Sequence, residues 1–259
     1  MDPGPLRDLL TLALGVVTGF FSGAFGVGGA VISTPGVRLL GVSALGAVGT
    51  TLPAILPGAV SGTLRYAREG LVDWRVVAIV APCGAVAAVL GSLGSHAVPG
   101  HGHWLMVLTA GCIGFTAIQL SRPGPDASPA SPRAHHPAGV LVLLGLGAGA
   151  MSGLLGVGGG IILVPAFSQI LGMPLTATVA TSLACVGILA IPSTVTHAFL
   201  GDIDWRIALL LAVTVVPGAR LGAAAALRAG DKRLRVAVAA FLGTVAVAYA
   251  IAEVLALVR

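Results

Sequence analysis

Eight apolar segments follow one another along the 259 residues, and only short polar gaps separate them. They cover approximately residues 8–34, 43–65, 74–96, 103–121, 138–167, 174–200, 205–228 and 234–257. A helix needs about 20 apolar residues to cross the hydrocarbon core of a bilayer. A single soluble core cannot bury all of these segments, so the pattern predicts an all-α integral membrane protein.

The charged residues are few and lie mostly at the ends of the segments. They make up 9% of the chain, whereas a soluble domain carries about 25%. The net charge is +5, but the cations form no basic stripe with interleaved aromatic residues, so nucleic acid is not an expected partner. We expect the lipid bilayer as the partner, with the Lys and Arg residues setting the orientation of the chain in it.

One glycine-rich motif occurs twice. GFFSGAFGVGG begins at Gly19 and GAMSGLLGVGG at Gly149, an offset of 130 residues that Pro35 and Pro165 keep. Further along, the offset is 131, shared by the pairs Thr50 and Thr181, Thr51 and Ser182, Asp73 and Asp204, and Trp74 and Trp205. The matches indicate an internal duplication with four segments per copy: repeat 1 over residues 1–120 and repeat 2 over residues 138–259.

The stretch between the two repeats is polar. Residues 121–137 read SRPGPDASPASPRAHHP, which is rich in Pro and Ser. Such a composition cannot bury enough apolar surface to fold by itself. We expect a flexible linker here.

Two topologies fit four segments per repeat. Four full crossings make the repeats parallel, whereas a re-entrant first element followed by three crossings inverts them. With full crossings, the cations at segment ends divide eight against five between the two sides. With re-entrant first elements they divide nine against four, the four being Arg7, Arg38, Arg206 and Arg259. Because cytoplasmic loops carry an excess of Lys and Arg, this distribution favours inverted repeats with both termini outside.

The two glycine motifs are predicted helix breaks. Each glycine weakens a helix by about 1 kcal/mol, and irregular backbone at membrane depth must be surrounded by protein or line a cavity. Broken helices at matching positions of two repeats point to a transport site, and free amides at a helix N-terminus bind anions. The alternative is close helix packing through small residues. The predicted anion site comprises Gly26, Gly28, Gly29, Gly156, Gly158, Gly159 and Gly160.

Hydroxyl and cationic side chains complete the candidate substrate site. Thr50 and Thr51, with Thr181 and Ser182, offer hydroxyl donors to an oxyanion, and bonding to helix carbonyls is the alternative. Arg220 lies within the apolar run VVPGARLGAAAA, where a guanidinium must face a cavity, a partner or an anion. Snorkelling to the membrane surface is the alternative for Arg220.

Histidines raise the question of protons and metals. His197, near the end of its segment, can carry protons, so protons are a candidate coupling ion; an interfacial histidine is the alternative. His96, His101 and His103 flank one loop in a weak metal pattern, and we predict neither a metal site nor a cofactor.

The sequence lacks the motifs of P-loop ATPases, zinc metalloproteases and serine hydrolases. It has no P-loop lysine motif, no HExxH and no GxSxG element. We therefore expect a secondary transporter and no enzyme, with a passive anion channel as the alternative. The sequence is compatible with a monomer and with a homo-oligomer.

The paired glycine and proline motifs resemble the sulfite exporter TauE/SafE family. The motif reads GVGGGIILVP over Gly156–Pro165 and GVGGAVISTP over Gly26–Pro35, with Ala30 where the second copy has Gly160. The resemblance covers nearly the whole chain. It implies a carrier in the bacterial inner membrane that moves sulfite, sulfonates or related sulfur-containing anions, and a small organic carboxylate is the alternative cargo. The departure at Ala30 implies that the two half-sites differ.

Overall fold

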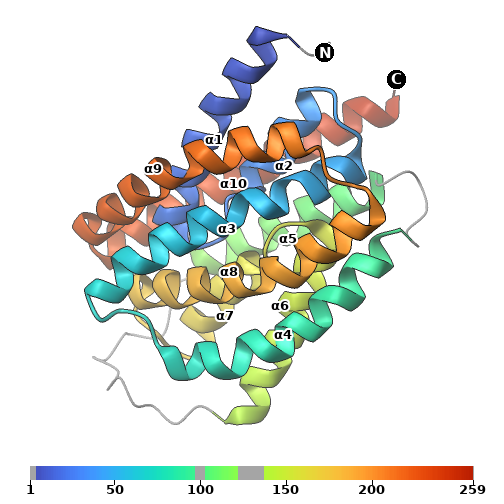
Figure 1. Cartoon of the computed structure of the whole chain (residues 1–259). Coiled ribbons are helices and arrows are strands. Elements are labelled where there is room, and N and C mark those ends of the chain that lie inside the picture. The colour runs from blue at the N-terminus through green and yellow to red at the C-terminus, as the bar shows by residue number, and fades with distance from the viewer. Residues whose placement is uncertain (1–3, 97–102, 122–136, 259) are drawn as a thin grey trace.

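The computed structural model describes residues 4–96, 103–121 and 137–258, so most of the expected linker lies outside the described residues. Ten helices and no strand occupy these ranges (Figure 1). In repeat 1 they are α1 (Pro5–Phe25), α2 (Ala30–Leu39), α3 (Ala44–Arg68), α4 (Trp74–Ser95) and α5 (His103–Ser121). In repeat 2 they are α6 (Ala138–Leu155), α7 (Gly160–Gln169), α8 (Leu175–Leu200), α9 (Trp205–Ala229) and α10 (Asp231–Val258).

The lengths and surfaces of the helices are those of a membrane protein. Among the described residues, six helices are long and apolar enough to cross a bilayer: α1, α3, α4, α6, α8 and α9. Large apolar side chains such as Val213 and Leu143 are exposed on their outer faces. Trp74 and Trp205 begin α4 and α9 and are also exposed, as is typical of aromatic residues at membrane surfaces. The chain is an all-helical integral membrane protein.

Both glycine motifs interrupt a helix. Residues 26–29 separate α1 from α2, and residues 156–159 separate α6 from α7. Gly26 and Gly156 end α1 and α6 with φ angles of 67° and 66°. Glycine is favoured in this left-handed region because it has no Cβ. The helix breaks expected from the motifs are therefore present in the structure.

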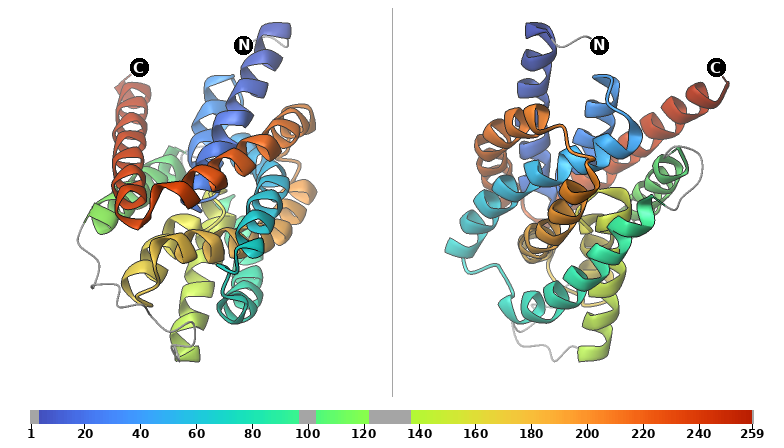
Figure 2. Two further views of the ribbon diagram at one scale, coloured as in Figure 1. Left: turned by 90° about the vertical axis from the view of Figure 1, so that its left-hand side faces the viewer. Right: turned by 45° about the vertical axis from the view of Figure 1, so that its right-hand side comes forward.

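After the first break, the chain turns back on itself. Gly29 lies against Thr18 and Gly36 lies against Leu14, so α1 and α2 run in opposite directions. Figures 1 and 2 show that α1 begins on the side where α10 ends, whereas α6 begins on the opposite side. The equivalent helices α1 and α6 thus enter the molecule from opposite sides.

Small residues bring the first helix of each repeat against the fourth helical element of the other. α1 places Gly15, Gly19 and Gly23 against Leu211, Val215 and Ala219 of α9. α6 places Gly145, Gly149 and Gly153 against Val80, Gly84 and Ala88 of α4, which are the same pairs shifted by the repeat offset. Numbering rises together in both helices of each pair, so both pairs are parallel. Among the described helices these are the most extensive contacts, and small residues permit them.

We expect Gly149→Val to destabilise the protein far more than Gly147→Val. A Cβ on Gly149 would collide with the carbonyl oxygen of Gly84, whereas at Gly147 no atom of the described residues lies within 4 Å of the added carbon. Overpacking of this kind costs about 1–3 kcal/mol or more. Thermal unfolding of the purified protein in detergent measures the difference. Equal melting temperatures for the two variants would contradict the close α4–α6 contact.

Candidate functional site

The two glycine breaks lie against each other inside the helix bundle. A Cβ atom on Gly160 would be 2.6 Å from the carbonyl carbon of Val27 and 2.7 Å from the carbonyl oxygen of Gly26. A Cβ atom on Gly28 would be 3.1 Å from the carbonyl oxygen of Val157. Residues 26–30 and 156–161 are all buried. The structure therefore brings together the glycines that the sequence predicted for the site.

The backbone amides that precede and open α2 and α7 are unpaired. Within the described residues, no hydrogen bond is made by the amides of residues 27–30 or of residues 157–161. A buried donor without a partner costs about 1–3 kcal/mol. The N-terminus of a helix also carries a positive partial charge. Two sets of such amides at facing breaks form an environment that favours an anion.

Each break is covered by a helix of the other repeat. A Cβ atom on Gly26 would be 2.6 Å from the carbonyl oxygen of Val179 in α8. A Cβ atom on Gly156 would be 2.8 Å from the carbonyl oxygen of Val48 in α3. Val48 and Val179 differ by the repeat offset of 131 residues, so the two contacts are equivalent.

Two of the predicted hydroxyl groups lie close to the breaks. Ser182 Oγ donates to the carbonyl oxygen of Gly26 at 2.9 Å. Thr51 Oγ1 donates to the carbonyl oxygen of Val48 at 3.1 Å and lies 3.2 Å from Thr34 Oγ1 of α2. In this structure both hydroxyl groups bond to protein, and they hold α8 and α3 against the broken elements.

Thr50 and Thr181 hold a different part of the structure together. Thr50 Oγ1 accepts a hydrogen bond from the backbone amide of Asp204 at 2.9 Å, and Thr181 Oγ1 accepts one from the amide of Asp73 at 3.0 Å. Asp204 and Asp73 are the N-cap residues of α9 and α4. The two threonines are fully buried and join each repeat to the first turn of a helix in the other.

Arg220 lies at the contact between α9 and α3. Its Nε atom donates to Ser61 Oγ at 3.1 Å, and the residue as a whole is exposed. Ser61 Oγ in turn donates to the carbonyl oxygen of Val216 at 3.4 Å. Arg220 is therefore bound to a neighbouring helix in this structure, and its role in substrate binding stays a prediction.

Two serines belong to the candidate site although the sequence prediction did not include them. Ser22 and Ser152 are buried one turn before the breaks, and within the described residues their hydroxyl groups have no hydrogen-bond partner. A Cβ atom on Gly29 would lie 3.4 Å from the Cβ atom of Ser22. The same serine stands at the fourth position of both motif copies, GFFSGAFGVGG and GAMSGLLGVGG, so the sequence carried a signal for it.

The two breaks differ in their backbone. Gly29 has a φ angle of −54°, in the right-handed helical region, whereas its counterpart Gly159 has a φ angle of 73°. The next position is Ala30 in repeat 1, fully buried with its methyl group in place, and Gly160 in repeat 2. The sequence difference between Ala30 and Gly160 thus accompanies a different path of the chain.

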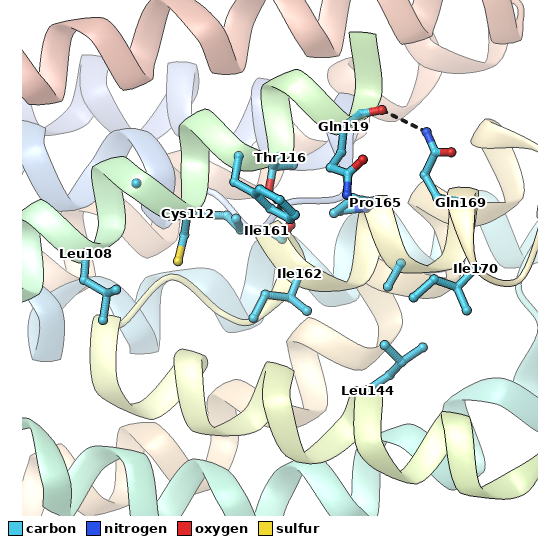
Figure 3. A pocket seen from close by; sticks show the side chains of 13 residues that line it. Leu108, Cys112, Thr116, Gln119, Leu144, Ile161, Ile162, Pro165, Gln169 and Ile170 are labelled. Carbon is cyan, nitrogen blue, oxygen red and sulfur yellow. Dashed lines mark hydrogen bonds between the residues drawn. The ribbon is translucent and has the colours of Figure 1, made fainter. Parts of the chain in front are cut away.

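A groove between α5, α6 and α7 is lined by other residues. Figure 3 shows its wall, mainly apolar side chains such as Leu108, Leu144 and Ile162, and its volume is about 500 Å³. Thr116 Oγ1 donates to the carbonyl oxygen of Ile161 at 2.8 Å, and the Gln169 side-chain amide donates to a backbone carbonyl at 2.8 Å. A groove lined mainly by apolar side chains, without a cationic residue, does not suit an anion. The breaks remain the candidate anion site.

Of the three histidines that flank one loop, the structure describes only the side chain of His96. His101 and the side chain of His103 lie outside the described residues. His96 Nε2 lies 2.8 Å from Asp202 Oδ2, and His197 Nδ1 lies 2.8 Å from the same oxygen. The sequence pattern did not include Asp202.

A bundle of apolar helices with two facing helix breaks has the architecture of a membrane transporter. Residues 11–249 match the family described as sulfite exporter TauE/SafE, and the chain belongs to that family. The membership expected from the glycine motifs is thus confirmed, and the family is one of membrane transporters.

Two relatives agree with this assignment. The chain is 30% identical over 228 residues to a probable membrane transporter protein of Xylella fastidiosa (strain Temecula1), a match that covers 85% of each chain. It is 25% identical over 239 residues to the probable membrane transporter protein YunE of Bacillus subtilis (strain 168), covering 83% of this chain and 87% of that one. No solved structure matches the chain. The chain is a multi-pass membrane transporter.

We expect Gly160→Ala to abolish transport and Ala30→Gly to retain it. The first change places a methyl group against the backbone of the other break, where both contacts are shorter than 2.8 Å, whereas the second removes a methyl group that the structure already accommodates. Solute uptake by equal amounts of purified protein in proteoliposomes measures the effect. Full activity of Gly160→Ala would mean that close contact between the breaks is not required.

Proposed function

We propose that the protein is a secondary carrier of small anions, with sulfite, sulfonates or related sulfur-containing oxyanions as its substrate class. The observation that carries the proposal is the pair of facing breaks whose buried amides are unpaired, at residues 27–30 and 157–161. These amides can bind a negative charge without any cationic side chain.

The donor groups match the chemistry of an oxyanion. Such an anion has several acceptor oxygens around one central atom, and amides can reach it from both breaks while the free hydroxyl groups of Ser22 and Ser152 lie one turn away. The family name supports sulfite as a member of the substrate class. A small carboxylate presents two oxygens and is the competing cargo.

Alternating access between inverted repeats is the proposed mechanism. Three features support it: α1 and α6 begin on opposite sides, α2 turns back along α1, and each break is covered by a helix of the other repeat. In this arrangement α1–α2 and α6–α7 are re-entrant elements, and rocking of one repeat against the other opens the breaks to each side in turn. Both named relatives are bacterial, and we propose the bacterial inner membrane as the location.

The transport proposal predicts saturable uptake of labelled sulfite, thiosulfate or a small sulfonate into proteoliposomes, which Gly158→Leu abolishes. Gly158 has a φ angle of 77°, and its Cβ would lie 2.9 Å from Val186 Cγ1, so a leucine both strains and fills the break. Gly147→Leu is the matched control, because this glycine lies on the exposed face of α6.

Each outcome of the uptake experiment has a separate meaning. Acceleration of uptake by solute on the far side indicates a carrier, and its absence indicates a passive channel. If acetate or lactate is taken up and the sulfur anions are not, the substrates are small carboxylates, and the proposed anion site is still supported. Equal uptake by Gly158→Leu and Gly147→Leu would remove the breaks as the site.

The inverted topology predicts that the two ends of the α1–α2 hairpin label from the same side of the membrane. Leu6 and Leu39 are 59% and 82% exposed and suit introduced cysteines in a variant that lacks the native ones. A membrane-impermeant maleimide should modify both from one side and a cysteine at Arg68 from the other, since the 25 residues of α3 span about 37 Å. Labelling of the cysteines at Leu6 and Leu39 from opposite sides would establish full crossings and parallel repeats.

A further inference from the structure

Three ionisable side chains meet at one corner of the bundle. His197, at the end of α8, is fully buried, and its Nδ1 lies 2.8 Å from Asp202 Oδ2. His96, at the end of α4, is 37% exposed, and its Nε2 lies 2.8 Å from the same oxygen. On the other side of the ring, His197 Nε2 lies 3.2 Å from the carbonyl oxygen of Gly153 in α6. We call His96, His197 and Asp202 the histidine–aspartate cluster.

These contacts require a proton between His197 and Asp202. A carbonyl oxygen can only accept, so His197 Nε2 must donate to Gly153. With an ionised Asp202, Nδ1 must donate as well and the ring is an imidazolium; with a neutral ring, Asp202 itself must carry the proton and donate it to Nδ1. In both cases one proton lies between Nδ1 and Oδ2.

The distances favour a proton over a metal ion as the shared charge. The three facing atoms lie within 4.8 Å of one another, and the two histidine nitrogens are each 2.8 Å from the carboxylate oxygen. That is the length of a charge-assisted hydrogen bond. Two ligands of a tetrahedral zinc ion lie about 3.3 Å apart, given metal–ligand distances of about 2.0 Å. The cluster is therefore closed around a proton.

The counterparts in the opposite repeat provide an internal control, because none of the three equivalent positions holds a histidine or a carboxylate. At an offset of 131 residues, His197 corresponds to Tyr66, Asp202 to Leu71 and Leu227 to His96. Tyr66 Oη donates to the carbonyl oxygen of Gly23 at 2.7 Å, which is the counterpart of the bond from His197 to Gly153. In repeat 1, the hydrogen bond to the helix that precedes the break is made by the phenol of Tyr66, without a histidine. His197 and Asp202 come from repeat 2 and His96 from repeat 1, and their three counterparts form no second cluster of this kind.

The charges around the cluster are few. α6 contributes the Gly153 carbonyl, and α3 contributes Gly46 and Gly49, which pack near Asp202. Farther along, four charged residues at the beginnings of α1 and α9 pair with one another: Arg7 with Asp204 at 4.0 Å and Arg206 with Asp8 at 2.6 Å. Within the described residues, His96 is therefore the ionisable group that shares Asp202 with His197.

We infer that the histidine–aspartate cluster binds the proton that drives anion transport, an inference that rests on the proposed carrier function. Loss of the shared proton leaves a nitrogen lone pair facing either the carboxylate or the Gly153 carbonyl, so His197 must release one of them. Gly153 lies in the last turn of α6 before the break at residues 156–159. Proton binding is thereby linked to the position of the anion site, and the exposed edge of His96 gives the proton access from water.

The first test replaces each residue of the cluster by its counterpart in the opposite repeat, in the triple variant His96→Leu, His197→Tyr and Asp202→Leu. The readout is the ratio of anion uptake with and without a pH gradient in proteoliposomes. We expect this ratio to fall to unity in the triple variant and in the conservative variant Asp202→Asn, which keeps the shape of the side chain. Tyr66→Phe should retain the wild-type ratio. A wild-type ratio in Asp202→Asn would overturn the inference.

The second test measures the proton without transport. Nitrogen-15 NMR of histidine-labelled protein in detergent separates imidazolium from neutral rings, and the His197 signals are assigned by their loss in His197→Tyr. We expect signals of a shared proton that are lost at high pH in the wild type and are altered in Asp202→Asn. A neutral His197 that does not change between acidic and basic pH would overturn the inference, as would stoichiometric binding of added Zn²⁺ that Asp202→Asn abolishes. If no anion is transported while the NMR titration is as expected, the proposed function fails and the proton site remains.

Discussion

Inside a bilayer every backbone amide and carbonyl must find its hydrogen-bond partner within the protein. The rest of this structure is arranged around the two places where a helix is interrupted and leaves amides without such a partner. At residues 26–29 and 156–159 the helix ends and begins again, leaving buried amides unpaired. Such backbone is tolerated only where it is surrounded by protein or lines a cavity. Each break is accordingly packed against the other break and against a helix of the opposite repeat.

Glycine serves two separate purposes in this chain. At the breaks, Gly26, Gly28, Gly156 and Gly158 adopt positive φ angles that other residues avoid. Along α1 and α6, by contrast, the glycines are helical and permit backbone contact with α9 and α4. Helix breaks and close helix packing are therefore both present, at different positions of the same motif. The packing glycines hold the broken elements in place, because α1 and α6 carry the breaks at their ends.

Many contacts occur twice, at equivalent positions of the two repeats, so the positions at which the repeats differ are informative. Thr50 and Thr181 make equivalent hydrogen bonds, and so do Tyr66 and His197 with the carbonyls of Gly23 and Gly153. Two departures stand out against this symmetry: the different φ angles of Gly29 and Gly159, and the three ionisable residues of the histidine–aspartate cluster. The first departure lies within the breaks, and the second contacts α6 next to one of them through the bond from His197 to Gly153.

Hydropathy and the repeated motif were enough to predict a helical membrane protein, the helix breaks and the family, because apolar length and glycine content act locally along the chain. The partners of individual side chains were decided by tertiary structure. The sequence predicted Thr50 as a substrate donor, and only the structure shows that its oxygen accepts a hydrogen bond from the amide of Asp204, a residue 154 positions away. Asp202 contacts both His96 and His197 only because the fold brings the ends of α4 and α8 together. A hydrogen bond acts over about 3 Å, and no local pattern specifies which distant segment the fold brings within that distance.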